Sequence, residues 1–187
     1  MKLVMSRTFS TEGIILKRSN SGEADRVLTI LTKDRGKIAC IAKGVRKLSS
    51  SKRSSLEPGM LSKLFFVEGK GMLILTQAQV IEDFATTRVS LKSTRDLVQV
   101  LEIFDHLFVD EESQEELFNH AVEMMHEVAA AVTGEAGARA RLAGQLRELL
   151  EAMGYQDIAE TKFHNVTEYV EFITDKKMKG FKYLTVK

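Results

Sequence analysis

The sequence is poor in the residues on which several common functions depend. Its 187 residues include one cysteine, one proline and no tryptophan. A single cysteine, Cys40, excludes an internal disulfide and any zinc site built on several cysteines. No apolar run approaches the ~20 residues of a membrane-spanning helix. The start, MKLVMSRTFSTEG, lacks the apolar core and small-residue cleavage site of a signal peptide. We therefore expect a cytoplasmic protein that does not bind membranes.

Patterns typical of catalytic or metal sites are also missing. His120, Glu123 and His126 spell H-x-x-E-x-x-H, but at ~100° per residue the two histidines lie ~120° apart around a helix. Zinc helices instead place two histidines one turn apart. Cys40 lies in the apolar run KIACIAK, where a small buried hydrophobic residue is expected rather than a nucleophile. We predict a protein that is not an enzyme and needs no cofactor or metal.

Charge divides the chain into two halves. Residues 1–90 contain 16 Lys and Arg against 8 Asp and Glu, a net +8, and residues 91–187 contain the other 11 and 18, a net −7. The whole chain carries only +1. This asymmetry predicts two domains, with a basic domain that faces polyanions and an acidic one that faces solvent or another partner.

The first half has the pattern of a small β-barrel. Short runs rich in β-branched and large apolar residues are bounded by turn residues, namely TEGIILKR, RVLTILT, KIACIAK, LSKLFFVE and MLILTQAQV. Two of the connections, KDRG and EGKG, suit hairpin turns. Five strands with a longer connection between the third and fourth are typical of an OB-fold barrel. We therefore predict an OB-fold domain at residues 1–84.

The second half has helical periodicity. Apolar residues recur every three or four positions in TRDLVQVLEIFDHLF, LFNHAVEMMHEVAAAV, GARARLAGQLRELLEAM and NVTEYVEFITDK. We expect Ser93 or Thr94 to cap the first helix, Ser113 to cap the second with Glu116, and Gly154 to end the third. The prediction is an α+β protein whose residues 85–187 form an all-α bundle with a short tail, GFKYLTVK.

The most unusual segment is AKGVRKLSSSKRSSLEPG, from Ala42 to Gly59. It has no acidic residue before Glu57, and its cations are Lys43, Arg46, Lys47, Lys52 and Arg53. A run of like charge is often only a solvated surface. Beside an OB barrel, however, serines and cations supply donors for phosphate oxygens, and each neutralised phosphate releases counterions. We predict nucleic-acid binding by this segment, extended by Arg26, Arg35 and Lys37.

Strand aromatics are candidates for stacking on bases. Phe9, Phe65 and Phe66 lie in the predicted strands, and OB folds often bind single strands through such side chains. Adjacent strand residues point to opposite faces, so at most one of Phe65 and Phe66 faces outward.

An ordered set of motifs resembles the N-terminal domain of the RecO family of bacterial recombination mediators. It comprises E-G-I-I-L, G-E-A-D-R leading into L-T-x-x-T, G-K-I, A-K-G-x-R, and a basic serine loop that reaches L-x-P, within residues 10–82. The helix LRELLEAMGY is similar to the closing bundle helix of the family. The matching basic motif positions are Arg26, Lys43, Arg46, Lys52 and Arg53, with Gly44 between them.

The resemblance implies an OB domain followed by a helical domain, with binding of single- and double-stranded DNA and annealing of complementary strands. It also implies cooperation with RecR in loading RecA onto strands coated by single-strand-binding protein (SSB). The acidic C-terminal tail of SSB would bind the helical domain, where Arg139, Arg141 and Arg147 are the candidate contacts. Many family members carry a cysteine-rich zinc module after the Gly-Tyr step, and this chain has YQDIAETKFHNVTEYVEF there instead.

Two other functions fit the residues. An RNA-binding OB module would use the same stacking and phosphate contacts. A protein-interaction adaptor would pair its basic half with the acidic half of another copy or of a partner.

Overall fold

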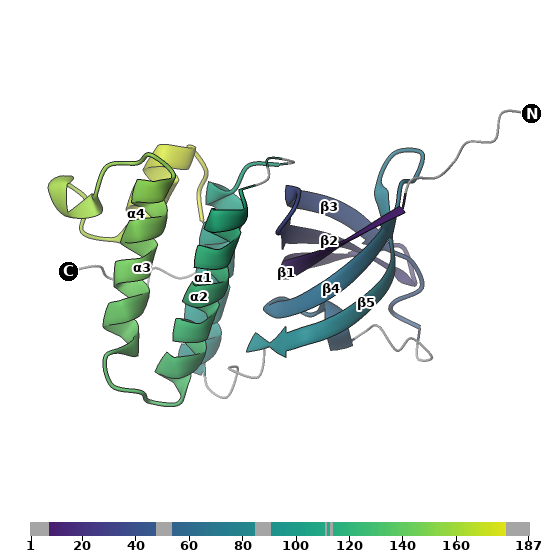
Figure 1. Cartoon of the computed structure of the whole chain (residues 1–187), viewed down its shortest axis with the longest axis horizontal. Helices are drawn as coiled ribbons and strands as arrows, with labels where there is room; N and C mark the ends of the chain where they lie inside the picture. Colours follow the sequence, from purple (N-terminus) through teal and green to yellow (C-terminus); the bar gives the residue numbers. More distant parts are fainter. Residues whose placement is uncertain (1–7, 48–53, 85–90, 111, 113, 179–187) are drawn as a thin grey trace, which may run out of the picture. The chain divides into compact units, whose positions relative to one another are not determined.

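The computed structural model describes residues 8–47, 54–84, 91–110, 112 and 114–178 (Figure 1). The chain divides into two compact units. The barrel unit comprises Met1–Asp83 and Asp110–Ser113, and the helical unit comprises Phe84–Val109 and Gln114–Lys187. A short segment from between two helices therefore groups with the barrel unit, which the sequence pattern did not predict.

The barrel unit is a closed five-stranded barrel with the neighbour order β1-β2-β3-β5-β4. All neighbouring strands are antiparallel except β3 and β5, which pair in parallel at Cys40 with Leu73 and Ile41 with Ile74. This order is that of the predicted OB fold. The strands are β1 (Thr8–Ser21), β2 (Asp25–Thr32), β3 (Gly36–Ala42), β4 (Met60–Val67) and β5 (Leu73–Asp83).

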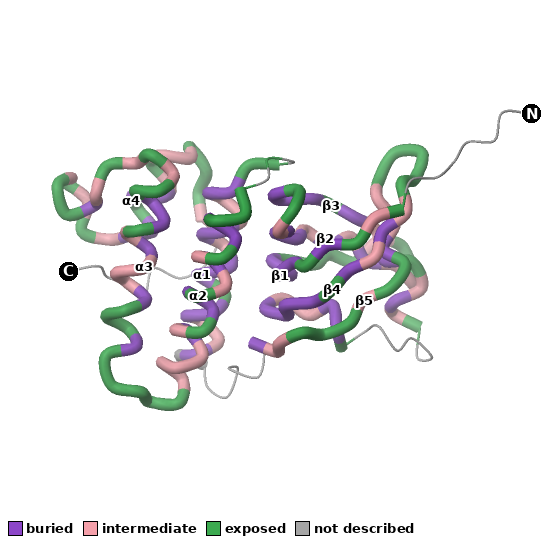
Figure 2. The backbone as a smooth tube through the Cα atoms, viewed as in Figure 1, coloured by how far each residue is buried: buried purple, intermediate pink, exposed green. Residues whose placement is uncertain are grey.

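β1 is long enough to close the barrel because it pairs along its first half with β4 and along its second half with β2. A register shift between Ile15 and Lys17 marks the place where the strand bends. Apolar side chains from the strands fill the interior, and Figure 2 marks stretches of the strand backbone whose residues are buried. Ile14, Ile30 and Leu64 have no exposed surface, and burying such a side chain stabilises the fold by about 1.5–3 kcal/mol.

The elements described in the helical unit are all helices, as predicted. It contains α1 (Leu91–Leu107), α2 (Glu115–Val132), α3 (Ala138–Ala152) and α4 (Val166–Thr174), with a short 3₁₀ helix η3 (Ile158–Glu160) before α4. α2 packs against both α1 and α3, and α1 packs against α4. A buried hydrogen bond of 2.7 Å from Gln99 Nε2 to Thr167 Oγ1 joins α1 to α4. None of the described helices is both long and apolar enough to cross a bilayer.

The predicted caps of the first two helices were wrong. α1 already begins at Leu91, so Ser93 and Thr94 lie inside the helix. The N-cap of α2 is Gln114, which makes no side-chain capping bond. Ser113, the predicted cap, lies outside the described residues.

The predicted end of α3 is confirmed. Gly154 has a positive φ of 83°, and its N–H donates to the Glu151 carbonyl at 2.8 Å. The N–H of Tyr155 donates to the Leu150 carbonyl at 2.9 Å. This pair of bonds is a Schellman motif, in which glycine is favoured because its φ is positive. The predicted tail GFKYLTVK lies outside the described residues.

Candidate nucleic-acid interface

The basic segment starts from a turn that is fastened to the turn between β1 and β2. The Gly44 N–H donates to Asp25 Oδ1 at 2.7 Å. The Arg46 N–H donates to the Ala24 carbonyl at 2.9 Å, and its guanidinium donates to the Gly22 carbonyl, also at 2.9 Å. The motifs G-E-A-D and A-K-G-x-R are therefore the two sides of one hydrogen-bonded structure.

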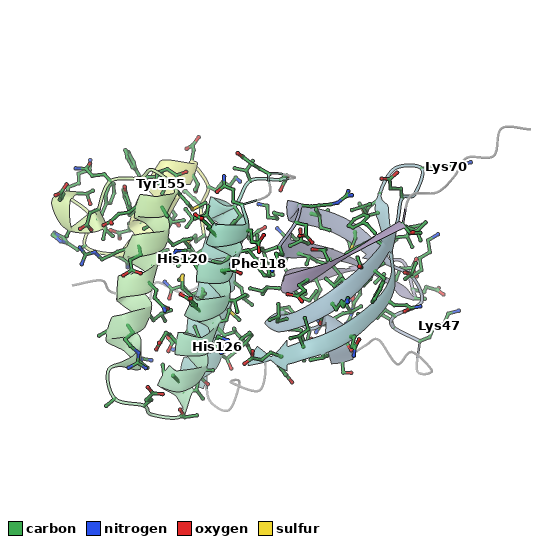
Figure 3. The ribbon with its side chains drawn as sticks, viewed as in Figure 1. Lys47, Lys70, Phe118, His120, His126 and Tyr155 are labelled. Atoms are coloured by element: carbon green, nitrogen blue, oxygen red, sulfur yellow. The ribbon has the colours of Figure 1, made fainter. Side chains whose placement is uncertain are left out.

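Two lysines stand on this fastened turn. Gly44 has a positive φ of 66°, and Val45 is fully buried. Lys43 and Lys47, on either side, are both exposed. Figure 3 shows Lys47 projecting away from the barrel. The turn therefore holds two ammonium groups at the surface while its backbone and one apolar side chain stay fixed.

The far end of the basic segment is also held by the barrel. Glu57 accepts ion pairs from Arg18 at 3.0 Å and from Arg26 at 3.2 Å. The Gly59 N–H donates to the Ile15 carbonyl at 2.9 Å, and Leu56 is fully buried. Lys52 and Arg53, two of the predicted contacts, lie outside the described residues.

Two other predicted contacts are buried in ion pairs. Arg26 is only 5% exposed and contacts Glu57, whereas Lys37 is 7% exposed and lies 3.5 Å from Asp110 Oδ1. Burial and a carboxylate partner make both cations less accessible to phosphates than Lys43 and Lys47. The role predicted for Arg26 and Lys37 in nucleic-acid binding stays a prediction.

Arg35 is exposed, and its guanidinium carbon lies 3.7 Å from the centroid of the Phe9 ring. Phe9 is also stacked on Phe66, with 5.0 Å between ring centroids. Arg35 therefore combines a cation–π contact with an exposed position on the turn between β2 and β3.

Lys70 is an exposed cation that sequence reasoning missed. Lys70 stands at the turn between β4 and β5 and projects outward from the barrel (Figure 3). The hairpin signal EGKG placed a lysine at a turn tip, and in OB folds the connection between the last two strands commonly contacts ligands. Together, the turn pattern and the position of this connection could have predicted Lys70 as a candidate contact.

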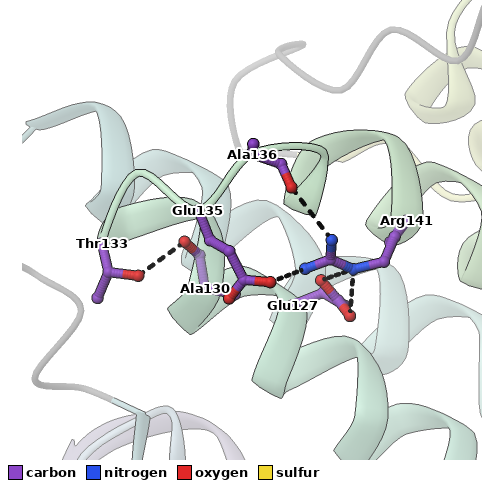
Figure 4. A network of polar contacts seen from close by, with 6 residues as sticks. All are labelled: Glu127, Ala130, Thr133, Glu135, Ala136 and Arg141. Carbon is purple, nitrogen blue, oxygen red and sulfur yellow. Dashed lines mark hydrogen bonds and ion pairs between the residues drawn. The ribbon is translucent and has the colours of Figure 1, made fainter.

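The arginines predicted in the helical unit are engaged with carboxylates. Arg139 contacts Asp96 at 2.5 Å. Figure 4 shows Arg141, which contacts Glu127 Oε1 at 2.9 Å and Glu135 Oε1 at 2.6 Å. Hydrogen bonding to Glu127 is the main reason that the pKa of Arg141 is raised above its ordinary value.

Arg147 forms a two-pronged contact with Asp157, through Nε at 3.0 Å and through a second guanidinium nitrogen. The hydrogen bonds from Arg147 lower the pKa of Asp157 below its ordinary value, and the Ala159 N–H adds to this effect. An acidic partner at any of these arginines would compete with a carboxylate of the chain itself.

The described cysteine and histidine side chains that could serve as zinc ligands do not come together. Cys40 is fully buried in β3, and burial raises the pKa of its thiol to about 12. His120 and His126 lie at different heights on α2 (Figure 3), and His126 meets the Phe84 ring edge-on. Across the described parts of the chain, no three His, Cys, Asp or Glu side chains gather in a way that could hold a metal ion.

Comparisons with known proteins match the barrel unit most directly. Residues 5–84 match the family model "Recombination protein O N terminal". The chain is 38% identical to the DNA repair protein RecO of Heliobacterium modesticaldum over 104 residues, which is 56% of this chain and 38% of that protein. It is 40% identical to the RecO protein of Moorella thermoacetica over 101 residues, or 54% of this chain and 38% of that protein.

A third match is longer but less similar in sequence. The RecO protein of Syntrophomonas wolfei is 27% identical over 115 residues, which is 62% of this chain and 46% of that protein. The chain thus covers less than half the length of each of these three relatives.

Proposed function

We propose that the chain is a DNA-binding protein of recombination and repair from the RecO family, because residues 5–84 match the N-terminal model of that family and two RecO proteins are 38% and 40% identical to it. Residues 1–84 would be the nucleic-acid-binding domain and residues 85–187 a helical domain. The protein would act by binding rather than by catalysis.

One observation carries the proposal, namely two exposed lysines on a turn that three hydrogen bonds fasten to its neighbour. A fixed turn loses little conformational freedom when it meets a phosphate, so more of the ion-pairing energy appears as affinity. In this arrangement Lys43 and Lys47 contact phosphates. Arg46 holds the turn in place through Gly22.

Binding through phosphates also explains how such a protein would anneal strands. Cations on the barrel would screen the phosphates of two strands at once and lower the repulsion that opposes pairing. Base pairing itself then supplies the sequence specificity. Both single- and double-stranded DNA are ligands in this scheme.

The finer part of the proposal follows the family resemblance. The protein would work with RecR to help load RecA onto SSB-coated single strands, and the acidic tail of SSB would bind near Arg139, Arg141 and Arg147. Since each arginine already contacts a carboxylate, the tail would have to exchange with it. Anisotropy of a labelled tail peptide with the wild type and Arg139→Ala measures this directly.

The deciding experiment is the affinity for a labelled single-stranded DNA oligomer across a salt series. The slope of log K against log salt is negative, and each lost phosphate contact on a single strand makes it less steep by about 0.7. We therefore expect Lys43→Ala with Lys47→Ala to make it less steep by about 1.4. The control is Lys176→Ala with Lys177→Ala, which removes the same charge from exposed positions of the helical unit. It leaves the slope nearly unchanged.

Three results would contradict the proposal. Equal slopes for both double variants would mean that the turn is only a solvated connection. Tighter binding to a matched RNA oligomer would favour the RNA-binding module. If no nucleic acid binds and the protein self-associates in low salt, sedimentation will identify the adaptor instead.

A further inference from the structure

The outer surface of β4 carries one aromatic side chain whose surroundings suit a nucleic-acid base. Alternate residues of a strand point to opposite faces. Leu64 and Phe66 point into the barrel, with 0% and 1% exposure. Lys63 and Phe65 therefore lie on the outer face, where Lys63 is exposed and Phe65 is half-buried.

The three strand phenylalanines differ in what already covers them. Phe66 belongs to the core. Phe9 is stacked on Phe66 and lies beneath the guanidinium of Arg35. Phe65 has a lysine nitrogen, Lys63 Nζ, 6.0 Å from its ring centroid. Of the three, Phe65 therefore has the ring best placed to accept another planar group.

Polar residues flank Phe65 on both neighbouring strands. In the register of the sheet, Ser10 of β1 and Gln77 of β5 are its direct partners. Gln79 of β5 is the partner of Lys63, and all three polar residues are exposed. Hydroxyl and amide groups beside an aromatic ring can donate to or accept from the edge of any base.

We propose that Phe65 is a stacking platform for one base of a single strand, with Lys63 contacting the adjacent phosphate. The arrangement joins the two elements of sequence-tolerant single-strand binding, an aromatic face and a cation that follows the backbone. Paired bases inside a duplex are already stacked and hidden, so the platform discriminates single-stranded from double-stranded DNA. This inference rests on the proposed DNA-binding function and extends it to a second contact region, separate in sequence from the Lys43 turn.

The test compares Phe65→Leu with the wild type, using an oligo(dT) strand, a duplex and an abasic phosphodiester chain of equal length. Loss of one stacked base weakens oligo(dT) binding by roughly 5- to 150-fold. The salt slope stays the same because no charge is removed. Binding to the duplex and to the abasic chain is unchanged. Phe65→Tyr keeps the ring and retains wild-type affinity, which separates stacking from a folding defect.

A second readout uses the absence of tryptophan from the chain. Phe65→Trp introduces the sole indole, and its fluorescence is quenched by oligo(dT) but not by the abasic chain if a base stacks there. The stacking proposal is wrong if oligo(dT) does not quench the fluorescence, or if Phe65→Leu and the wild type bind oligo(dT) equally. Either result leaves the proposed phosphate contacts of Lys43 and Lys47 unaffected. Failure of the wild type to bind any of the three probes would overturn the proposed function as well.

Discussion

The two units use their cations in different ways. In the helical unit, Arg139, Arg141 and Arg147 each contact a carboxylate of the same unit. In the barrel unit, Lys43 and Lys47 are exposed on a turn that is held by backbone groups and by one aspartate. The arginines of the helical unit are therefore neutralised by ion pairs within that unit, whereas the two lysines of the barrel unit remain exposed to solvent.

This contrast shows that the number of basic residues in a unit is a poor guide to how many of its cations are exposed. Arg26 and Lys37 belong to the basic unit and are nonetheless buried beside Glu57 and Asp110. What distinguishes the Lys43 turn is that backbone groups, the Asp25 carboxylate and the Arg46 guanidinium specify its shape, so its lysines are not needed to hold it.

The largest expected effect tests how tightly backbone geometry specifies the barrel unit. Gly36 has a φ of +60°, and a Cβ there would lie 2.2 Å from the Glu112 carbonyl oxygen. We expect Gly36→Ala to lower the free energy of unfolding by about 3 kcal/mol or more, since a strained φ and a backbone clash add together. Urea denaturation followed by circular dichroism measures this change.

The matched control is Gly22→Ala. Gly22 has a similar φ of +58° but nothing within 4 Å of the added Cβ, so we expect only the conformational cost of about 1 kcal/mol. Equal losses for the two variants would show that the Asp110–Ser113 segment does not constrain the turn between β2 and β3.

Asp25→Ala should have an effect of intermediate size, and it separates the contribution of net charge to DNA binding from that of the turn geometry. Asp25→Ala makes the barrel unit more positive but removes the acceptor for the Gly44 N–H. We expect a loss of about 1–2 kcal/mol in stability and, despite the added charge, weaker binding of single-stranded DNA. Denaturation and anisotropy on the same variant measure both quantities.

Glu23→Ala is the control for Asp25→Ala, because Glu23 is an exposed neighbour in the same turn and its loss changes the net charge equally. Its removal should slightly strengthen DNA binding through reduced repulsion. If both variants bind more tightly to the same extent, charge alone governs affinity and the fastened turn has no role.

The smallest effect concerns the internal pairs of the helical unit. Arg147 holds the pKa of Asp157 below its ordinary value, so their pair stabilises the fold above the unfolded carboxyl pKa of about 4. This stabilisation is lost as the pH falls through the lower folded pKa. We expect Arg147→Ala to lower the Tm by at most a few degrees at neutral pH, with the difference shrinking in acid.

Asp157→Asn supplies the comparison for this pH dependence, because it removes the titrating carboxyl itself. When Arg147→Ala is added to Asp157→Asn, we expect the difference in Tm between the double and the single variant not to depend on pH. A constant Tm difference between Arg147→Ala and wild type across the acid range would mean that the ion pair does not contribute.

Local sequence patterns were sufficient for the element types but not for the contacts between distant residues. Alternation predicted the β-strands, and the spacing of apolar residues predicted the helices, because both depend on near neighbours. Gly154 could be assigned to a helix end for the same reason. The start of α1 at Leu91 was missed because serine and threonine are favoured as N-cap residues but also occur inside helices.

The candidate site was predictable only in part. The run of cations was visible in the sequence, but the burial of Arg26 depends on Glu57, which lies 31 positions away. Likewise, the pairing of Lys37 with Asp110 requires a segment between two helices to return to the barrel unit. The motif residues Gly44 and Arg46 suggested phosphate binding, and their hydrogen bonds assign them first to the turn itself.

The two separately fastened ends of the basic segment have a practical consequence for protein engineering. The Lys47 N–H donates to the Gly44 carbonyl at 3.1 Å, and the Ser55 carbonyl accepts from Ser62 Oγ at 3.3 Å, so the backbone on each side of the segment has hydrogen bonds of its own. Lengthening a connection between two fixed stems costs only about 0.6 kcal/mol per doubling. Replacing the residues between the two stems, with other cation spacings or with a reporter peptide, is therefore a direct way to vary the charge of the segment while the hydrogen bonds of both stems are kept.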